Sequence, residues 1–183
     1  VAGLAATHGL QVNLIRFGEP KTADAKWAHR SALASGVSIV PFHPDVLSGS
    51  DVVVDAILGT GFNRPLEGSI LEGIRAINAS GKPVLSLDVP SGLNSDTGEA
   101  VEGAVGATAT ISFICLNPGI VTGSGPDRCG RVLFDSLQVP ETVFSGFEPV
   151  AARISTGRVA GMLQMLPRRH HKGDAGHLLV VGG

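Results

Sequence analysis

The fold class of this chain is set by Val52-Val-Val-Asp55-Ala-Ile-Leu-Gly59-Thr-Gly-Phe-Asn-Arg64-Pro65. Residues 52–58 are apolar except for Asp55, which is typical of a strand covered on both faces. A glycine-rich turn follows, and residues 69–78 then carry apolar side chains along one face of a helix. Residues 84–87 form the next buried strand. This order predicts an α/β fold with a mostly parallel sheet and helices on both faces.

The alternation of strands and helices continues on both sides of this stretch. Upstream, apolar patterns predict elements at residues 1–9 (the back half of a helix), 11–17 (strand), 23–33 (helix) and 37–40 (strand). Downstream, strands are predicted at 108–115 and 131–137, joined by a glycine-rich stretch without a helix-length pattern. We therefore expect an antiparallel or edge pairing of these two strands.

The last quarter of the chain changes in character. Residues 140–149 form an irregular linker, 156–166 show a short helical pattern, and 178–181 are a buried-strand pattern. Both ends of the chain look cut, because a helix pattern is already under way at Val1 and the chain stops just after the last strand pattern. We predict a first domain over 1–145, and a linker with the first segment of a second domain over 146–183.

The composition excludes several classes of function. The 183 residues include 14 Lys and Arg against 16 Asp and Glu, a formal net charge of −2. We therefore expect no nucleic-acid partner and no membrane attachment, and no apolar run reaches the length of a membrane span. The two cysteines, Cys115 and Cys129, form no CxxC motif, and we expect Cys115 to be a small core residue. These features predict a cytoplasmic protein.

Two loops at strand ends are candidates for chemistry. The glycines of residues 59–65 allow close approach of an anion, and Arg64 can bind phosphate, although a tight turn without a ligand stays possible. Asp88 ends the strand at 84–87, where partial removal from water suits a carboxylate to acid/base work. The alternative is an Asp that caps the next segment. Asp55 lies inside an apolar strand, which requires a paired partner, backbone amides or a cation.

The ordered set of motifs resembles a known family. The matching stretches are 54–65, 77–78, 83–98, 108–113 and 129–132. They resemble the N-terminal YjeF domain, which is the NAD(P)H-hydrate epimerase. Residues 168–183 resemble the beginning of the ribokinase-like dehydratase domain that follows the epimerase in bifunctional proteins. The resemblance implies a Rossmann-like three-layer α/β/α domain and the start of a ribokinase-like domain.

The resemblance also implies roles for particular residues. Asp88 would be the catalytic acid/base and would contact the substrate, while Asp55 and Ser91 would contribute to a potassium site. The substrate-binding loop would consist of Gly59, Thr60, Gly61, Phe62, Asn63, Arg64 and Pro65. The chain departs from the family at Asn117, where a lysine is expected before the Pro-Gly pair.

The implied activity is that of an isomerase in metabolite repair. It would interconvert the R and S forms of hydrated NADH or NADPH, so that an S-specific dehydratase, a lyase, restores both. The implied partners are this small-molecule substrate and further copies of the chain in a homodimer or higher homo-oligomer. We expect no dehydratase activity from this chain. The alternative is a nucleotide-binding or protein-interaction module of the YjeF type without catalysis.

Overall fold

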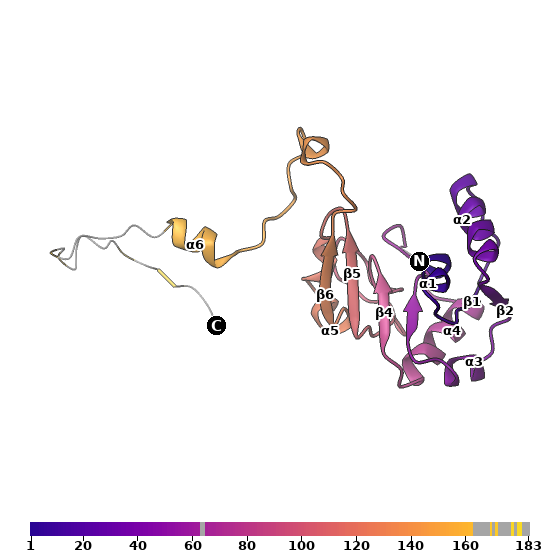
Figure 1. Cartoon of the computed structure of the whole chain (residues 1–183). Coiled ribbons are helices and arrows are strands. Elements are labelled where there is room, and N and C mark those ends of the chain that lie inside the picture. Colours follow the sequence, from indigo (N-terminus) through magenta and orange to yellow (C-terminus); the bar gives the residue numbers. More distant parts are fainter. Residues whose placement is uncertain (63–64, 163–168, 170, 172–176, 178, 181–183) are drawn as a thin grey trace. The chain divides into compact units, whose positions relative to one another are not determined.

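The computed structural model describes residues 1–62, 65–162, 169, 171, 177 and 179–180. The chain divides into two compact units, Val1–Val143 and Phe144–Gly183, which are described one at a time. In the first unit, strands and helices alternate along the chain as far as the fourth strand (Figure 1). The prediction of an α/β fold is confirmed.

The first unit contains two sheets of parallel strands. In the larger sheet the order is β3 (Val53–Asp55), β4 (Val84–Leu87), β5 (Ala109–Phe113) and β6 (Arg131–Asp135), and in the smaller one β1 (Asn13–Ile15) pairs with β2 (Ser38–Val40). Because β3 and β4 are parallel neighbours, the loops that follow them leave the same edge of the sheet. Open α/β sheets bind ligands at this carboxyl edge.

The pairing of β5 with β6 corrects one expectation. The two strands are parallel, with Ala109 opposite Arg131 and Phe113 opposite Asp135, so an antiparallel pairing is wrong. The expected edge position of β6 is confirmed. The crossover that a parallel pair needs is supplied by η1 (Pro118–Ile120) and α5 (Gly125–Arg128). These helical turns are too short to leave a periodic apolar pattern in the sequence.

The helices form where the apolar periodicity predicts them. They are α1 (Ala2–Thr7), α2 (Ala23–Ala34) and α4 (Gly68–Ala79), whereas the short α3 (Asp45–Ser48) was not predicted. α4 buries Ile74 and Ile77, which pack in the main core cluster with Val53 and Val84 of the sheet. α2 is more exposed, and its Trp27 has an exposed fraction of 67%. The core therefore lies between α4 and the larger sheet.

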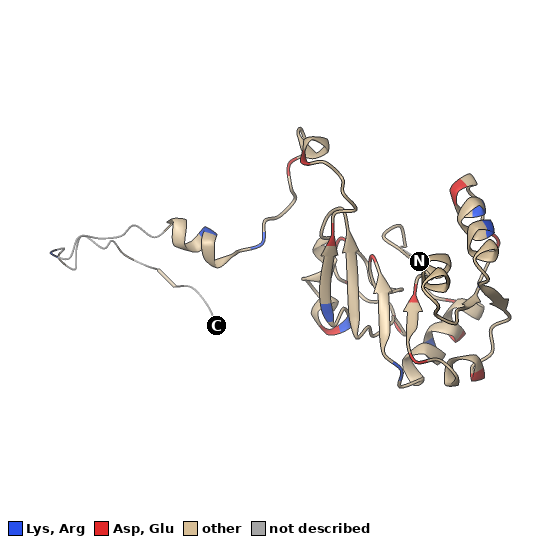
Figure 2. Cartoon of the chain, in the orientation of Figure 1, with Lys and Arg blue, Asp and Glu red and all other residues tan. Residues whose placement is uncertain are grey.

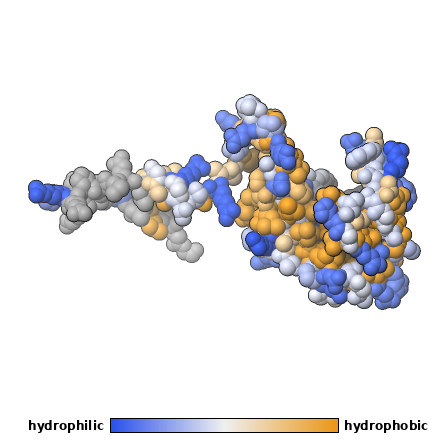
Figure 3. Space-filling view, viewed as in Figure 1, coloured by the Kyte–Doolittle hydropathy of each residue, from blue (hydrophilic) through white to orange (hydrophobic). Residues whose placement is uncertain are grey.

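The two faces of the larger sheet differ in burial across β3, β4 and β5. On one face, Asp55, Ser86 and Thr110 lie opposite one another across β3, β4 and β5, and all three are fully buried. The other face carries apolar residues such as Val54 and Leu133, which are 43% and 38% exposed. Figure 3 shows an apolar surface over these strands. A buried row of polar side chains thus starts at Asp55, next to the carboxyl edge.

The second unit contains α6 (Thr156–Met162), and η2 (Glu141–Phe144) lies at the boundary between the units. The helix predicted at 156–166 is confirmed as far as residue 162, and residues 163–168 lie outside the described residues. The strand predicted at 178–181 lies partly outside them, and the assignment of 146–183 to a second domain stays a prediction. Within the described part of the chain, no helix combines the length and the apolar character needed to cross a bilayer.

Candidate functional site

The two loops that the sequence analysis selected meet at the carboxyl edge of the larger sheet. Ser91, in the loop after β4, accepts a hydrogen bond from the backbone N–H of Leu58 at 2.9 Å. Further along the same loop, the Ser95 hydroxyl donates to the carbonyl of Thr60 at 3.2 Å. These bonds join the glycine loop to the Asp88 loop at two points. The position of each loop therefore depends on the other.

Asp55 is the centre of this connection. It is fully buried, and its carboxylate accepts hydrogen bonds from Ser86 Oγ (2.8 Å), Ser91 N (2.8 Å) and Ser91 Oγ (2.6 Å). A longer contact of 3.4 Å joins Asp55 Oδ1 to the N–H of Ile57. Among the described residues, no Lys or Arg forms an ion pair with Asp55. Backbone and hydroxyl donors, rather than a basic side chain, therefore hold this buried charge.

Asp88 takes a backbone conformation that side chains rarely adopt. Its φ is 70°, in the left-handed region, where a residue other than glycine is disfavoured by about 1–2 kcal/mol. The conformation is held because Asp88 N donates to the carbonyl of Ile111 at 2.8 Å and Val89 N donates to Leu87 O at 3.0 Å. The half-buried carboxyl group is thus aimed by strained backbone at the edge of the sheet. Such strain collects at functional sites.

The carboxylate of Asp88 lies between two other segments. On one side, a Cβ added to Gly59 would lie 3.7 Å from Asp88 Oδ2, so the glycine loop runs directly beside the acid. On the other side, the amide Nδ2 of Asn117 lies 3.5 Å from Asp88 Oδ1. Figure 2 shows acidic residues at the carboxyl ends of β3, β4 and β6. Asp88 therefore lies beside both the glycine loop and Asn117, the residue that precedes η1.

The glycine loop offers exposed backbone to a ligand. Gly59, Thr60 and Gly61 are exposed, and no described residue accepts a hydrogen bond from the N–H of Thr60 or Gly61. The N–H of Phe62 turns back to the carbonyl of Gly59 at 3.2 Å, which closes a tight turn. Asn63 and Arg64 lie outside the described residues. The described part of the loop can therefore present backbone donors to an anionic group.

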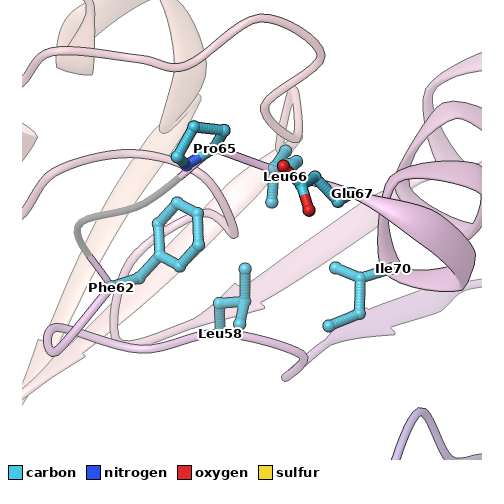
Figure 4. A pocket seen from close by; sticks show the side chains of 6 residues that line it. All are labelled: Leu58, Phe62, Pro65, Leu66, Glu67 and Ile70. Carbon is cyan, nitrogen blue, oxygen red and sulfur yellow. The ribbon is translucent and has the colours of Figure 1, made fainter.

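A hollow lies beside this loop. Its volume is ≈ 280 Å³, and Figure 4 shows the side chains around it: Leu58, Phe62, Pro65, Leu66, Glu67 and Ile70. All of these residues are apolar except Glu67, whose carboxylate adds polar surface to the lining. Leu58, Leu66, Glu67 and Ile70 were not among the predicted site residues. Leu66 and Ile70 are separated by Glu, Gly and Ser, so no local apolar pattern points to this set.

The segment that carries Asn117 is locked against the Asp88 loop by close backbone packing. Gly119 N donates to Ser95 O at 2.6 Å, and Ser124 N donates to Gly98 O at 2.8 Å. A side chain at Gly119 would collide with the carbonyl of Asn94. These contacts leave η1 little freedom to move. They explain why Asn117 stays next to Asp88.

The two cysteines lie in different surroundings. Cys115 follows β5 and is exposed, so the expectation of a small core residue is wrong; the strand ends at Phe113, before it. Cys129 is fully buried. Burial raises the pKa of the Cys129 thiol, while its hydrogen bond with Thr110 acts in the opposite direction. Within the described residues, no group of three or more His, Cys, Asp or Glu side chains is arranged to hold a metal ion.

Comparison with known proteins identifies the group to which these features belong. The family model described as YjeF-related protein N-terminus matches residues 1–119. The bifunctional NAD(P)H-hydrate repair enzyme Nnr of Coxiella burnetii is 37% identical over 100% of this chain and 38% of its own length. The enzyme of the same name from Escherichia coli is 35% identical over 100% of this chain and 36% of its own. The chain thus spans less than two fifths of these relatives.

A shorter relative and a solved structure also match. The NAD(P)H-hydrate epimerase of Limosilactobacillus fermentum is 34% identical over 73% of this chain and 64% of its own length. The crystal structure of yeast ynu0, YNL200c, superposes with a TM-score of 0.66 at 16% identity, over 86% of this chain and 68% of that one. At this identity the structural match concerns the fold alone. It is consistent with the Rossmann-like α/β architecture expected from the sequence.

Proposed function

Because this chain belongs to the family of YjeF-related protein N-termini, we propose that it interconverts the R and S forms of hydrated NADH and NADPH. The observation that carries the proposal is the position of Asp88. Its strained backbone aims a half-buried carboxyl group at the carboxyl edge of the sheet, beside Gly59 and the exposed glycine loop. The curated relatives named NAD(P)H-hydrate epimerase and NAD(P)H-hydrate repair enzyme support the choice of substrate.

The reaction needs one acid/base group and no redox step. The carbon to be inverted carries a hydroxyl and is bonded to the ring nitrogen of the hydrated nicotinamide. Asp88 in its acid form protonates the departing oxygen, the C–O bond breaks, and the nitrogen lone pair forms a transient C=N bond as water leaves. Water then adds to the opposite face of the ring, the C=N electron pair returns to nitrogen, and the Asp88 carboxylate accepts the proton.

The glycine loop would hold the nucleotide. The backbone N–H groups of Thr60 and Gly61 can donate to its phosphates, because no described residue uses them. Phe62 and Pro65 line the adjacent hollow, where a ring of the substrate can lie (Figure 4). Asn63 and Arg64 complete the proposed substrate-binding set. Their roles rest on the family resemblance.

A potassium ion is the proposed cofactor, with Asp55 and Ser91 among its ligands. The oxygen-only donor set suits a hard cation. The Ser91 hydroxyl has two acceptors within reach, Asp55 Oδ1 at 2.6 Å and Leu58 O at 3.3 Å. When its hydrogen points to Leu58 O, Ser91 Oγ and Asp55 Oδ1 each have a free lone pair. The residues therefore fit the ion, which would compensate the buried charge of Asp55.

The potassium proposal is tested by thermal stability. The Tm of the chain is compared in potassium chloride and in choline chloride at equal ionic strength, for the wild type and for Asp55→Asn. We expect the Tm of the wild type to rise with potassium and that of the variant not to respond, because the neutral amide removes the charge that holds the ion. An equal response of both proteins, or none in the wild type, would contradict the assignment.

The remaining proposals concern the protein as a whole. We propose that residues 146–183 begin a ribokinase-like dehydratase domain and that this chain alone does not catalyse dehydration. A homo-oligomeric state, a cytoplasmic location and the absence of nucleic-acid or membrane partners stay predictions. The free cysteines support the cytoplasmic location. The net charge of −2 supports the absence of nucleic-acid and membrane partners.

The proposed activity is tested with purified R-hydrate of NADPH. The chain is added, and the R and S forms are separated by chromatography at successive times. We expect S-hydrate to form faster than in buffer alone, in proportion to protein concentration. Binding of the hydrate without such an increase would instead support a nucleotide-binding module. No binding and no increase would contradict both.

A further inference from the structure

Asn117 lies next to the reacting acid. Its amide Nδ2 is 3.5 Å from Asp88 Oδ1, and both side chains are half-buried. A carboxylate only accepts hydrogen bonds, so the NH₂ group of the amide must be the part that faces it. Within the described residues, this is the side-chain hydrogen bond that reaches the Asp88 carboxylate. Contacts of this kind are often long before substrate binds, and they shorten in the complex.

The amide of Asn117 is held in place by its surroundings. Asn117 precedes the first residue of η1, and its carbonyl accepts from Ile120 N at 3.2 Å. Pro118 follows directly and restricts the backbone on both sides of the bond. Gly119 is fixed to the Asp88 loop through Ser95 O. Backbone hydrogen bonds therefore connect the segment that carries Asn117 to the loop that carries Asp88.

The charge of the side chain at position 117 matters for the neighbouring carboxyl group of Asp88. A cation within a few ångströms of a carboxylate favours its ionised form, and an anion favours its protonated form, whereas a neutral amide does neither strongly. The other titratable groups on the segments around Asp88 include Asp55 at the end of β3, Cys115 after β5 and Asp135 at the end of β6. None of the three has a hydrogen bond or ion pair with Asp88 in the described part of the structure. A charged side chain at position 117 would therefore act on Asp88, whereas the amide of Asn117 adds no charge beside it.

We propose that Asn117 is a positioning residue for the acid/base step: its neutral amide orients the Asp88 carboxyl group and leaves it free to exchange its proton. This inference rests on the proposed function for its kinetic consequence. It predicts that charge introduced at position 117 moves the protonation of Asp88. It also predicts that removal of the amide weakens turnover more than substrate binding.

The kinetic test compares three variants over a range of pH. Asn117→Asp puts a negative charge beside Asp88, so the pH at which epimerisation responds to Asp88 should rise by roughly half a unit or more. Asn117→Lys should lower it. Asn117→Leu keeps the volume but removes the donor, and we expect kcat to fall about tenfold with KM within a few-fold. Identical pH profiles and kcat values in all variants would overturn the proposal.

Asn94→Asp is the matched control. Asn94 lies further along the Asp88 loop, where its Oδ1 accepts from Asp96 N at 2.9 Å and Thr97 N at 3.0 Å. Aspartate can accept the same two bonds, so the variant should fold. It adds the same charge without a contact to Asp88, and its pH profile should follow the wild type. An equal shift in Asn94→Asp and Asn117→Asp would show a general charge effect and contradict the specific role.

A second measurement does not depend on activity. The titration of the Asp88 carboxyl carbon is followed by NMR in ¹³C-aspartate-labelled protein, with the signal assigned by its loss in Asp88→Asn. We expect the midpoint to rise in Asn117→Asp, to fall in Asn117→Lys and to stay unchanged in Asn94→Asp. Absence of epimerisation together with these shifts would refute the proposed function and leave the contact intact. Unmoved midpoints would refute the contact.

Discussion

At the scale of single residues, Asp88 combines a strained backbone with a half-buried carboxyl group that accepts a long hydrogen bond from Asn117. Its backbone has a φ of 70°, and the hydrogen bond from Asp88 N to Ile111 O of β5 helps to hold this conformation. Asp55 has a different environment, because it is fully buried and accepts hydrogen bonds from Ser86 and Ser91. Asp55 and Asp88 therefore have different roles. Asp55 organises the loops, and Asp88 is left available for chemistry.

The first prediction concerns Asp88 itself. Asp88→Asn keeps the shape of the side chain but removes the exchangeable proton, so epimerisation should fall by about a hundredfold or more, with substrate affinity within a few-fold. Initial rates of S-hydrate formation and equilibrium binding measure the two quantities. Asp96→Asn, in an exposed turn of the same loop, is the control and should behave as the wild type. Full turnover in Asp88→Asn would remove the residue from the mechanism.

The second prediction uses the buried thiol. The pKa of Cys129 is raised above its ordinary value of 9.0 in the folded protein, so above that pH the unfolded chain loses the proton first. The free energy of unfolding should therefore be unaffected by this group below about pH 9 and should fall as the pH rises towards the folded pKa. The chain contains no tyrosine, so no phenol group titrates in the same pH range as this thiol.

Urea unfolding of the wild type and Cys129→Ala between pH 7 and pH 10.5 measures the effect. The difference in unfolding free energy between the two proteins should shrink at alkaline pH, because the variant has no thiol to titrate. Parallel pH profiles of the two proteins would show that the thiol ionises as easily in the folded state as in the unfolded one.

At the scale of elements, the site depends on the interlocked backbone of residues 94–98 and 117–125. Gly119 approaches the Asn94 carbonyl so closely that no side chain fits between them. The third prediction follows: Gly119→Ala should lower the free energy of unfolding by roughly 1–3 kcal/mol, because the segment must move apart. It should also weaken the contact of Asn117 with Asp88. Chemical denaturation and the Asp88 titration measure the two effects.

Gly49→Ala is the control for this prediction. Gly49 follows α3 with an ordinary φ of −83°, and a Cβ there meets nothing within 4 Å. Its substitution should leave stability unchanged or slightly increased. If Gly119→Ala is as stable as Gly49→Ala, the two loops are not locked together by the packing described above.

These elements also show what the sequence can and cannot predict. Apolar runs and helical periodicity are local signals, so the core of β3, α4 and β4 and the meeting of the two loops follow from the sequence. The parallel pairing of β5 with β6 depends on η1 and α5, which are too short to show periodicity. The contact of Asn117 with Asp88 is a consequence of that crossover. No local pattern indicates it.

At the scale of the whole molecule, β6 leaves one edge of the larger sheet unpaired within the described residues. All five of its residues are exposed, including Phe134 at 55%. Exposed apolar edge strands promote association between chains. The fourth prediction is that the chain self-associates as its concentration rises and that Phe134→Lys reduces this association. Sedimentation velocity at several concentrations measures it.

Leu137→Lys provides a control matched in exposure. Leu137 is 54% exposed but lies just beyond β6. Its substitution adds the same charge without altering the strand, so association should decrease less. An equal decrease in both variants would point to net charge as the cause. A chain that stays monomeric at all concentrations would contradict the role of the edge.

The central claim is that Asp88 inverts the substrate by expelling its hydroxyl as water and adding water to the other face. Epimerisation of R-hydrate in H₂¹⁸O tests this most directly, with the oxygen content of the S product measured by mass spectrometry. The account predicts that each inverted molecule formed by the wild type has gained one ¹⁸O. An S product that keeps its original ¹⁶O would mean that the C–O bond never breaks, and it would contradict the account.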